Sequence, residues 1–75
     1  MDNNHYENQR KQRLRTLRNY IGDEAPVKKK DLYAYASWEW GVTRETAKDY
    51  VETLLVVNKI EEDEEDEDVI EGVIE

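Results

Sequence analysis

The chain has 75 residues, of which 11 are basic and 19 acidic, and its net charge is −8. A chain this short buries only about 60% of the surface that it exposes when unfolded, so it has room for one thin core. The size excludes a two-domain enzyme and argues against a deep catalytic cleft. The absence of cysteine excludes disulfides and thiolate metal sites.

The charge is unevenly distributed along the chain. Residues 61–75 hold ten acidic and no basic residues, whereas residues 1–60 hold eleven basic and nine acidic ones. The longest apolar run, residues 54–57, is far below the ~20 residues of a membrane span, and the polar N-terminus lacks the layout of a signal peptide. We therefore expect a cytoplasmic, intracellular protein without a membrane partner.

The pattern predicts a disordered start over residues 1–5 and a first helix over about 6–21. Leu14, Leu17 and Ile21 form one helical stripe, which Tyr6 extends toward the N-terminus, and Gly22 is expected to end the helix. After the connector, Val27 is expected to form a very short strand or to plug the core.

Basic residues cover the other faces of this first helix. They are Arg10, Lys11, Arg13, Arg15 and Arg18. Three interpretations have equal weight: contacts to a flanking DNA backbone, contacts to the acidic tail of a partner subunit, and an ordinary solvated basic face.

A second helix is predicted over about 28–39 and begins with three lysines. Lys28 is a poor cap, but Asp31 in the first turn suits the helix dipole. Gly41 is expected to end this helix. The inward stripe is Leu32, Tyr35, Ala36 and Trp40. Two aromatic residues off that stripe are candidates for a dimer or partner patch, namely Tyr33 and Trp38.

A third helix is predicted over about 43–57, with Thr43 as its N-cap and Asn58 as a left-handed residue at its end. Its core stripe is Ala47, Tyr50 or Val51, Leu54 and Leu55. Residues 59–75 are expected to form a hairpin with an acidic tip at 61–68, because Val69 to Ile74 is rich in β-branched residues.

Two segments have residue patterns typical of a known family: the turn between the second and third helices, and the residues that follow the third helix. Gly41 supplies the positive φ of a tight turn between helices, and Ser37 is small enough for close approach. Ala36, Trp40, Val42, Ala47 and Tyr50 have the spacings that a helix-turn-helix buries. Residues 8–75 thus resemble the winged helix-turn-helix family, although Asn58 stands where the family usually has glycine.

The resemblance implies a mainly α fold with a small β-hairpin, made of three helices plus a C-terminal wing. The alternative is a three-helix miniprotein with a disordered acidic tail. In the family the third helix enters the DNA major groove. By position, the exposed residues of this helix are Thr43, Arg44, Glu45, Thr46, Lys48 and Asp49.

Each of these residues has a chemistry suited to DNA. Arg44 is suited to a bidentate pair with guanine, Glu45 to the cytosine amine, and Lys48 to phosphate. Thr43 or Thr46 is suited to phosphate or a thymine methyl group. Lys28, Lys29 and Lys30 lie where many family members contact phosphate. For any single residue of the third helix, a solvated helix face is an equally good interpretation, whereas for the three lysines phosphate contact is favoured over a solvated helix start.

The predicted wing departs from the family pattern, because Glu61–Asp68 are eight consecutive carboxylates and a wing tip that touches DNA commonly carries Lys or Arg. Such a run is incompatible with contact to phosphate. Either the wing points away from DNA, or the domain uses another surface. The run would also suit a flexible loop that keeps the protein soluble, or a charge that reduces non-specific binding to DNA.

The first functional hypothesis is sequence-specific binding of double-stranded DNA by a small transcriptional regulator. It would resemble the compact winged-helix regulators of prokaryotes, archaea, plasmids and viruses, act as a homodimer and use no cofactor. The alternative is a protein-interaction winged-helix module of a replication or transcription assembly, which binds a basic partner through the Glu61–Asp68 run or through an aromatic face. We expect no enzyme activity, no catalytic residue and no metal site, since His5 is the sole histidine.

Overall fold

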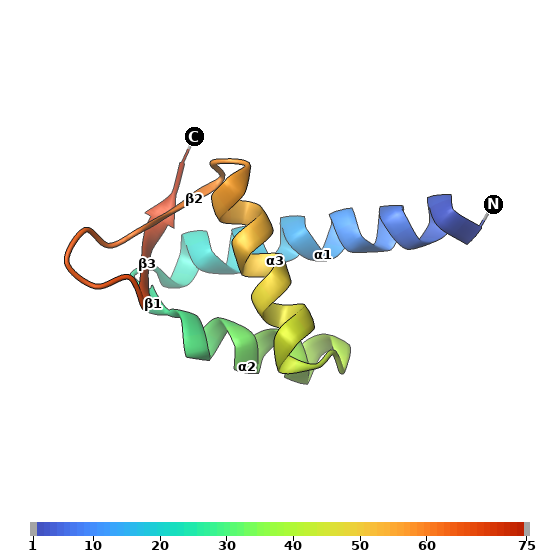
Figure 1. Cartoon of the computed structure of the whole chain (residues 1–75), viewed down its shortest axis with the longest axis horizontal. Helices are drawn as coiled ribbons and strands as arrows, with labels where there is room; N and C mark the ends of the chain where they lie inside the picture. Colours follow the sequence, from blue (N-terminus) through green and yellow to red (C-terminus); the bar gives the residue numbers. More distant parts are fainter. Residues whose placement is uncertain (1, 75) are drawn as a thin grey trace.

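The computed structural model describes the backbone of residues 2–74 and the side chains of residues 7–74. Its elements in chain order are α1 (Asp2–Glu24), β1 (Val27–Lys28), α2 (Lys29–Trp40), α3 (Arg44–Val56), β2 (Ile60–Glu62) and β3 (Val69–Val73). Figure 1 shows the N-terminal half of α1 extending beyond the rest of the molecule, with the hairpin at the opposite end. The predicted class, mainly helical with a small β-sheet, is confirmed.

Helix α1 is longer than the sequence pattern predicts at both ends. It begins at Asp2 rather than Tyr6, so the expected disordered start is not found over residues 2–5, and it ends at Glu24. The expected stop at Gly22 was wrong, because the amide of Ala25 still donates to Ile21 at 2.8 Å. The helix ends there because the residue before Pro26 is driven out of the helical region. The Tyr6 side chain lies outside the described side chains.

Helix α2 begins one residue after the predicted start. Lys28 makes no side-chain cap hydrogen bond, as the sequence indicated, and the helix ends at Trp40 with Gly41 as its C-cap. Gly41 has φ of 64°, and its amide donates to Ser37 at 2.9 Å. The left-handed glycine is therefore confirmed as the turn that leads into α3.

Both ends of α3 follow local signals in the sequence. The Thr43 hydroxyl oxygen accepts the Thr46 amide at 3.2 Å, which confirms the N-cap. At the other end Asn58 has φ of 59°, its amide donates to Leu55, and the Lys59 amide donates to Leu54. These two bonds are a Schellman motif, so the helix end is satisfied by the backbone itself.

The strands form one antiparallel sheet in the order β1-β3-β2. Val27 pairs with Ile70, which shows that the segment after Pro26 is a short strand, and Ile60 pairs with Val73. The β2 strand contains Glu61 and Glu62, so the turn of the hairpin is 63–68 rather than the predicted acidic tip at 61–68.

The core lies where the three helices meet the sheet. Its buried residues are Leu17, Ile21, Leu32, Tyr50, Val51, Leu54, Ile60 and Ile70. A row of aromatic rings continues it between the helices: Tyr20 stacks on Tyr35 at 3.9 Å between ring centroids, and Trp40 meets Tyr35 and Tyr50 edge-on. This packing fixes α3 against α1 and α2, with its buried face inward.

Candidate functional site

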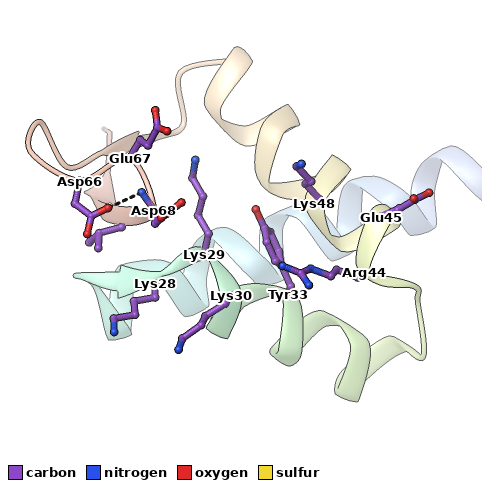
Figure 2. A pocket seen from close by; sticks show the side chains of 11 residues that line it. Lys28, Lys29, Lys30, Tyr33, Arg44, Glu45, Lys48, Asp66, Glu67 and Asp68 are labelled. Carbon is purple, nitrogen blue, oxygen red and sulfur yellow. Dashed lines mark hydrogen bonds between the residues drawn. The ribbon is translucent and has the colours of Figure 1, made fainter.

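A groove of about 780 Å³ lies between the start of α2, the first half of α3 and the end of the hairpin turn. Its basic lining residues are Lys28, Lys29, Lys30, Arg44 and Lys48. Tyr33 and Val69 also line it, and Figure 2 shows Tyr33 beside Arg44. The structure thus brings the lysine triplet beside α3, from which it is separated in the sequence.

The three lysines are not equivalent. In Figure 2 the Lys29 side chain extends toward the hairpin turn, whereas Lys28 and Lys30 extend away from it. Lys28 and Lys30 are exposed, while Lys29 is half-buried. Lys28 and Lys30 are therefore the two members of the triplet whose ammonium groups remain open to an incoming anion.

Lys29 binds to the hairpin through both its side chain and its backbone. Its ammonium forms an ion pair with Glu62, and its amide donates to the Asp68 carbonyl at 2.8 Å. Partial burial acts to lower the pKa of Lys29, but the hydrogen bond and negative charge of Glu62 outweigh it, so this pKa lies above its ordinary value. Lys29 therefore serves as a clamp between α2 and the sheet.

Arg44 and Lys48 lie four residues apart on α3 and so share one exposed face. The Arg44 guanidinium lies over the Tyr33 ring, 5.8 Å from its centroid. Such a cation–π contact limits the freedom of the arginine while leaving its donors outward. Tyr33 packs against the core on one side and lines the groove on the other, where it supports Arg44. Its predicted place in a partner patch stays a prediction.

The two threonines at the start of α3, Thr43 and Thr46, form hydrogen bonds with each other. Thr43 accepts the Thr46 amide, and its hydroxyl donates to the Thr46 hydroxyl at 3.1 Å. Neither threonine lines the groove, whereas Glu45 does. Of the predicted residues on this helix, the groove therefore brings together Arg44, Glu45 and Lys48.

Acidic side chains of the hairpin turn border the same groove, namely Asp66, Glu67 and Asp68. The turn has its own order: Asp66 accepts the Asp68 amide at 2.9 Å, and Asp63 accepts the Glu65 amide at 2.8 Å. The end of the turn therefore borders the same groove as α3. Sequence reasoning treated the run as uniform and missed that three of its members reach this groove.

The basic row on α1 is divided between two roles. Arg10 lies 3.2 Å from Asp49 and 2.9 Å from the Thr53 hydroxyl, and Arg13 donates to the Tyr50 hydroxyl at 3.2 Å. Arg13 also lies over the Trp40 ring, and Arg18 donates to the Ile74 carbonyl at 3.4 Å. These three arginines dock α1 onto α3, α2 and the C-terminal end of the hairpin.

The two other members of the row are exposed. Lys11 and Arg15 border a smaller hollow of about 400 Å³ between α1 and the end of α3, which Leu14, Leu54 and Val57 also line. Trp38, the second residue of the expected aromatic patch, is 87% exposed. These surfaces are separate from the groove.

Comparison with protein-family models, with curated proteins and with solved structures found no match. None of the helices within residues 2–74 combines the length and apolarity needed to cross a membrane. In the same part of the chain, no three His, Cys, Asp or Glu side chains converge on a point where a metal ion would fit. The site therefore has to be interpreted from its own chemistry.

Proposed function

We propose that the chain is a winged helix-turn-helix domain that binds double-stranded DNA through α3 and the start of α2, as a small transcriptional regulator. The observation that carries this proposal is the groove, which sets Arg44 and Lys48 beside Lys28 and Lys30. Phosphate requires a basic surface, and base edges require donors presented on a rigid helix.

The packing of α3 supports its role as the helix that enters the major groove. Its inner face buries Ala47, Tyr50, Val51 and Leu54. The N-cap at Thr43 and the glycine turn at Gly41 fix its first residues, which are the ones that would meet base edges. The order of helices followed by an antiparallel hairpin agrees with the proposed family.

Within the groove, each cation has a distinct role. Arg44, held over Tyr33, would form the bidentate pair with guanine, because its donors are oriented before binding. Lys28, Lys30 and Lys48 would contact phosphate. Binding as a homodimer to two half-sites belongs to the same proposal, and sedimentation of the free protein and of its DNA complex tests it.

The test is a titration of labelled duplexes from the region upstream of the coding sequence, at about 50 and about 200 mM salt. We expect one duplex to bind, with affinity that falls steeply as salt rises. Lys48→Gln and Arg44→Gln should each weaken binding about tenfold. Lys59→Gln removes one positive charge from an exposed residue outside the groove, and it should change affinity less than about twofold. Equal losses for Lys48→Gln and Lys59→Gln, or no binding at low salt, would contradict the proposal.

A second function is favoured by the exposed acids of the hairpin. Among the described residues, one ion pair involves the hairpin, between Glu62 and Lys29. Glu64 and Glu65 are exposed and belong to no ion pair in this part of the chain. Such a surface suits a basic protein partner, as an interaction module of a replication or transcription assembly would require. Arg44→Glu separates the two functions: it should abolish DNA binding and leave a partner bound to the hairpin.

A further inference from the structure

Three acids of the hairpin turn border the groove that the proposed function assigns to DNA. Asp66, Glu67 and Asp68 line the same groove as Lys28 and Lys30. Figure 2 shows these carboxylates at one end of the groove, with Arg44 and Lys48 at the other. An anion that approaches the lysines therefore meets fixed negative charge as well as positive charge.

The position of these acids is set by the fold. The Lys29 amide donates to the Asp68 carbonyl, and the Lys29 ammonium is paired with Glu62 at the other side of the turn. The Asp66 carbonyl accepts the Val69 amide at 3.1 Å, and the Asp66 carboxylate accepts the Asp68 amide. A turn held at both ends keeps its carboxylates at the edge of the groove, while the Lys28 and Lys30 side chains extend away from the turn (Figure 2).

Other acids of the hairpin provide an internal comparison. Glu61, Glu64 and Glu65 are exposed and do not line the groove. They contribute the same number of charges as the three groove acids, and they belong to the same hairpin. A purely bulk effect of acidity would therefore be shared equally by the two sets.

We propose that Asp66, Glu67 and Asp68 compete with DNA phosphate for the lysines at the start of α2, and so suppress binding to duplexes that offer phosphate contacts alone. This inference rests on the proposed DNA-binding function and names the residues that determine its specificity. A duplex with the correct bases gains the contacts of Arg44 in addition. A random duplex does not, and for it the carboxylates cancel much of the attraction.

Coulomb's law gives the size of the effect. Two unit charges about 4 Å apart in water interact by a free energy that corresponds to roughly a fivefold change in affinity. The three acids lie at different distances from phosphate, so their joint effect on random duplex DNA should be on the order of tenfold at low salt. Salt weakens it, because exposed charges are screened over about 10 Å at 0.1 M.

The experiment compares two triple variants with equal net charge. One is Asp66→Asn, Glu67→Gln, Asp68→Asn, in which the new amide side chain at position 66 retains a carbonyl oxygen that can accept the backbone amide of residue 68. The control is Glu61→Gln, Glu64→Gln, Glu65→Gln. Affinity for a random duplex and for the upstream duplex is measured at about 50 and about 200 mM salt, with circular dichroism to verify folding.

We expect the groove variant to bind the random duplex about tenfold more tightly than the natural protein does, and the control variant less than about threefold more tightly. The ratio of specific to random affinity should fall in the groove variant alone. Equal gains in the two variants would overturn this inference while leaving DNA binding intact. Failure of the natural protein and both variants to bind any duplex would overturn the proposed function, and this inference with it.

A second measurement tests the lysines directly. Lys28→Gln with Lys30→Gln removes the cations for which the acids compete, and it leaves the Lys29–Glu62 pair intact. In that background, neutralising the three groove acids should raise affinity less than about twofold, because the two sets of charges are coupled. An undiminished gain would show that the acids repel DNA without competing for these lysines, and would contradict the proposal.

Discussion

Arg10 of α1 and Asp49 of α3 form an ion pair, with 3.2 Å between Nη2 and Oδ2. The same guanidinium nitrogen lies 2.9 Å from the Thr53 hydroxyl oxygen. Two residues that the sequence places on candidate DNA-binding surfaces are therefore occupied with each other. The pair fixes the middle of α3 against α1, and it leaves the first turn of α3 free to meet a ligand.

The Arg10 contacts should contribute measurably to stability. We expect Arg10→Gln to lower the free energy of unfolding by about 1 kcal/mol, since one hydrogen bond and one partly exposed ion pair are lost. Urea denaturation measures the change. Lys11→Gln is the matched control, because Lys11 is exposed on the same helix, and it should change stability by less than about 0.5 kcal/mol. A double-mutant cycle with Asp49→Asn should give a coupling of about 0.5 kcal/mol, and a coupling of zero would refute the pair.

Gly41 should tolerate a side chain poorly, for conformational reasons alone. A Cβ at this position would meet nothing within 4 Å, but φ is 64°, a region that costs other residues about 1–2 kcal/mol. Gly41→Ala should lower the free energy of unfolding by that amount, and Gly41→Asn by less. Gly72→Ala, where the space is also open and φ is not left-handed, should change stability by less than about 0.5 kcal/mol. Equal effects at the two glycines in urea denaturation would show that the turn is not the cause.

Ile70 should be the residue that secures the hairpin to the helices. It is fully buried and pairs with Val27 across the sheet. Ile70→Ala should cost about 2–5 kcal/mol, a large part of the roughly 4–11 kcal/mol expected for a domain of this size. Ile70→Val, which removes one methylene, should cost about 0.5–1.5 kcal/mol. Thermal unfolding followed by circular dichroism checks the order, and similar midpoints for the two variants would contradict burial of this side chain.

Stability should fall at alkaline pH. Burial lowers the pKa of Lys29, but the hydrogen bond to Glu62 and the negative charges around the ammonium together outweigh burial and raise this pKa above its ordinary value. Burial, with Glu39 and Tyr20, raises the pKa of Tyr35 above its ordinary value. Both folded groups hold their protons more tightly than the unfolded chain does. Their contribution is therefore complete below the unfolded pKa values and is lost as pH rises through the raised ones.

Urea denaturation at intervals between about pH 8 and about pH 11 measures this loss. The decline should be shallower in a variant that combines Lys29→Gln with Tyr35→Phe, because neither new side chain titrates. Identical slopes in the natural protein and in this variant would assign the alkaline loss to other groups.

The ends of α2 and α3 lie closer to their predicted positions than the ends of α1 do, because the residues that stop each helix differ. For α2 and α3 the end signals are self-contained: Thr43 bonds within its own turn, and Gly41 and Asn58 adopt left-handed backbone conformations. For α1 the glycine signal at Gly22 competes with Pro26 four residues later. Gly22 stays helical and packs against Val73: a Cβ atom at position 22 would lie 3.8 Å from Cγ1 of Val73. This contact joins residues far apart in the sequence, so no local pattern predicts it.

The sequence predicted the basic residues of the candidate site, but it did not predict that acidic residues of the hairpin turn would line the same groove. Lys28, Lys30, Arg44 and Lys48 stand out in the sequence, and the groove does contain them. The pairing of Lys29 with Glu62 joins residues 33 positions apart, and it decides where the hairpin turn lies. Likewise, the sequence shows a basic row on α1, but the contacts of Arg10, Arg13 and Arg18 depend on how α3 crosses that helix.

By itself, the sequence determined the fold class, the approximate positions of the three helices and the turn at Gly41. It also determined the separation of a basic body from an acidic end. These follow from spacing, capping and backbone preference, which act over a few residues. The tertiary structure alone decided which charges meet. It placed Asp66, Glu67 and Asp68 beside the lysines and turned three arginines inward. Charge contacts of this kind depend on distances between remote segments, and only the packing of the core sets those distances.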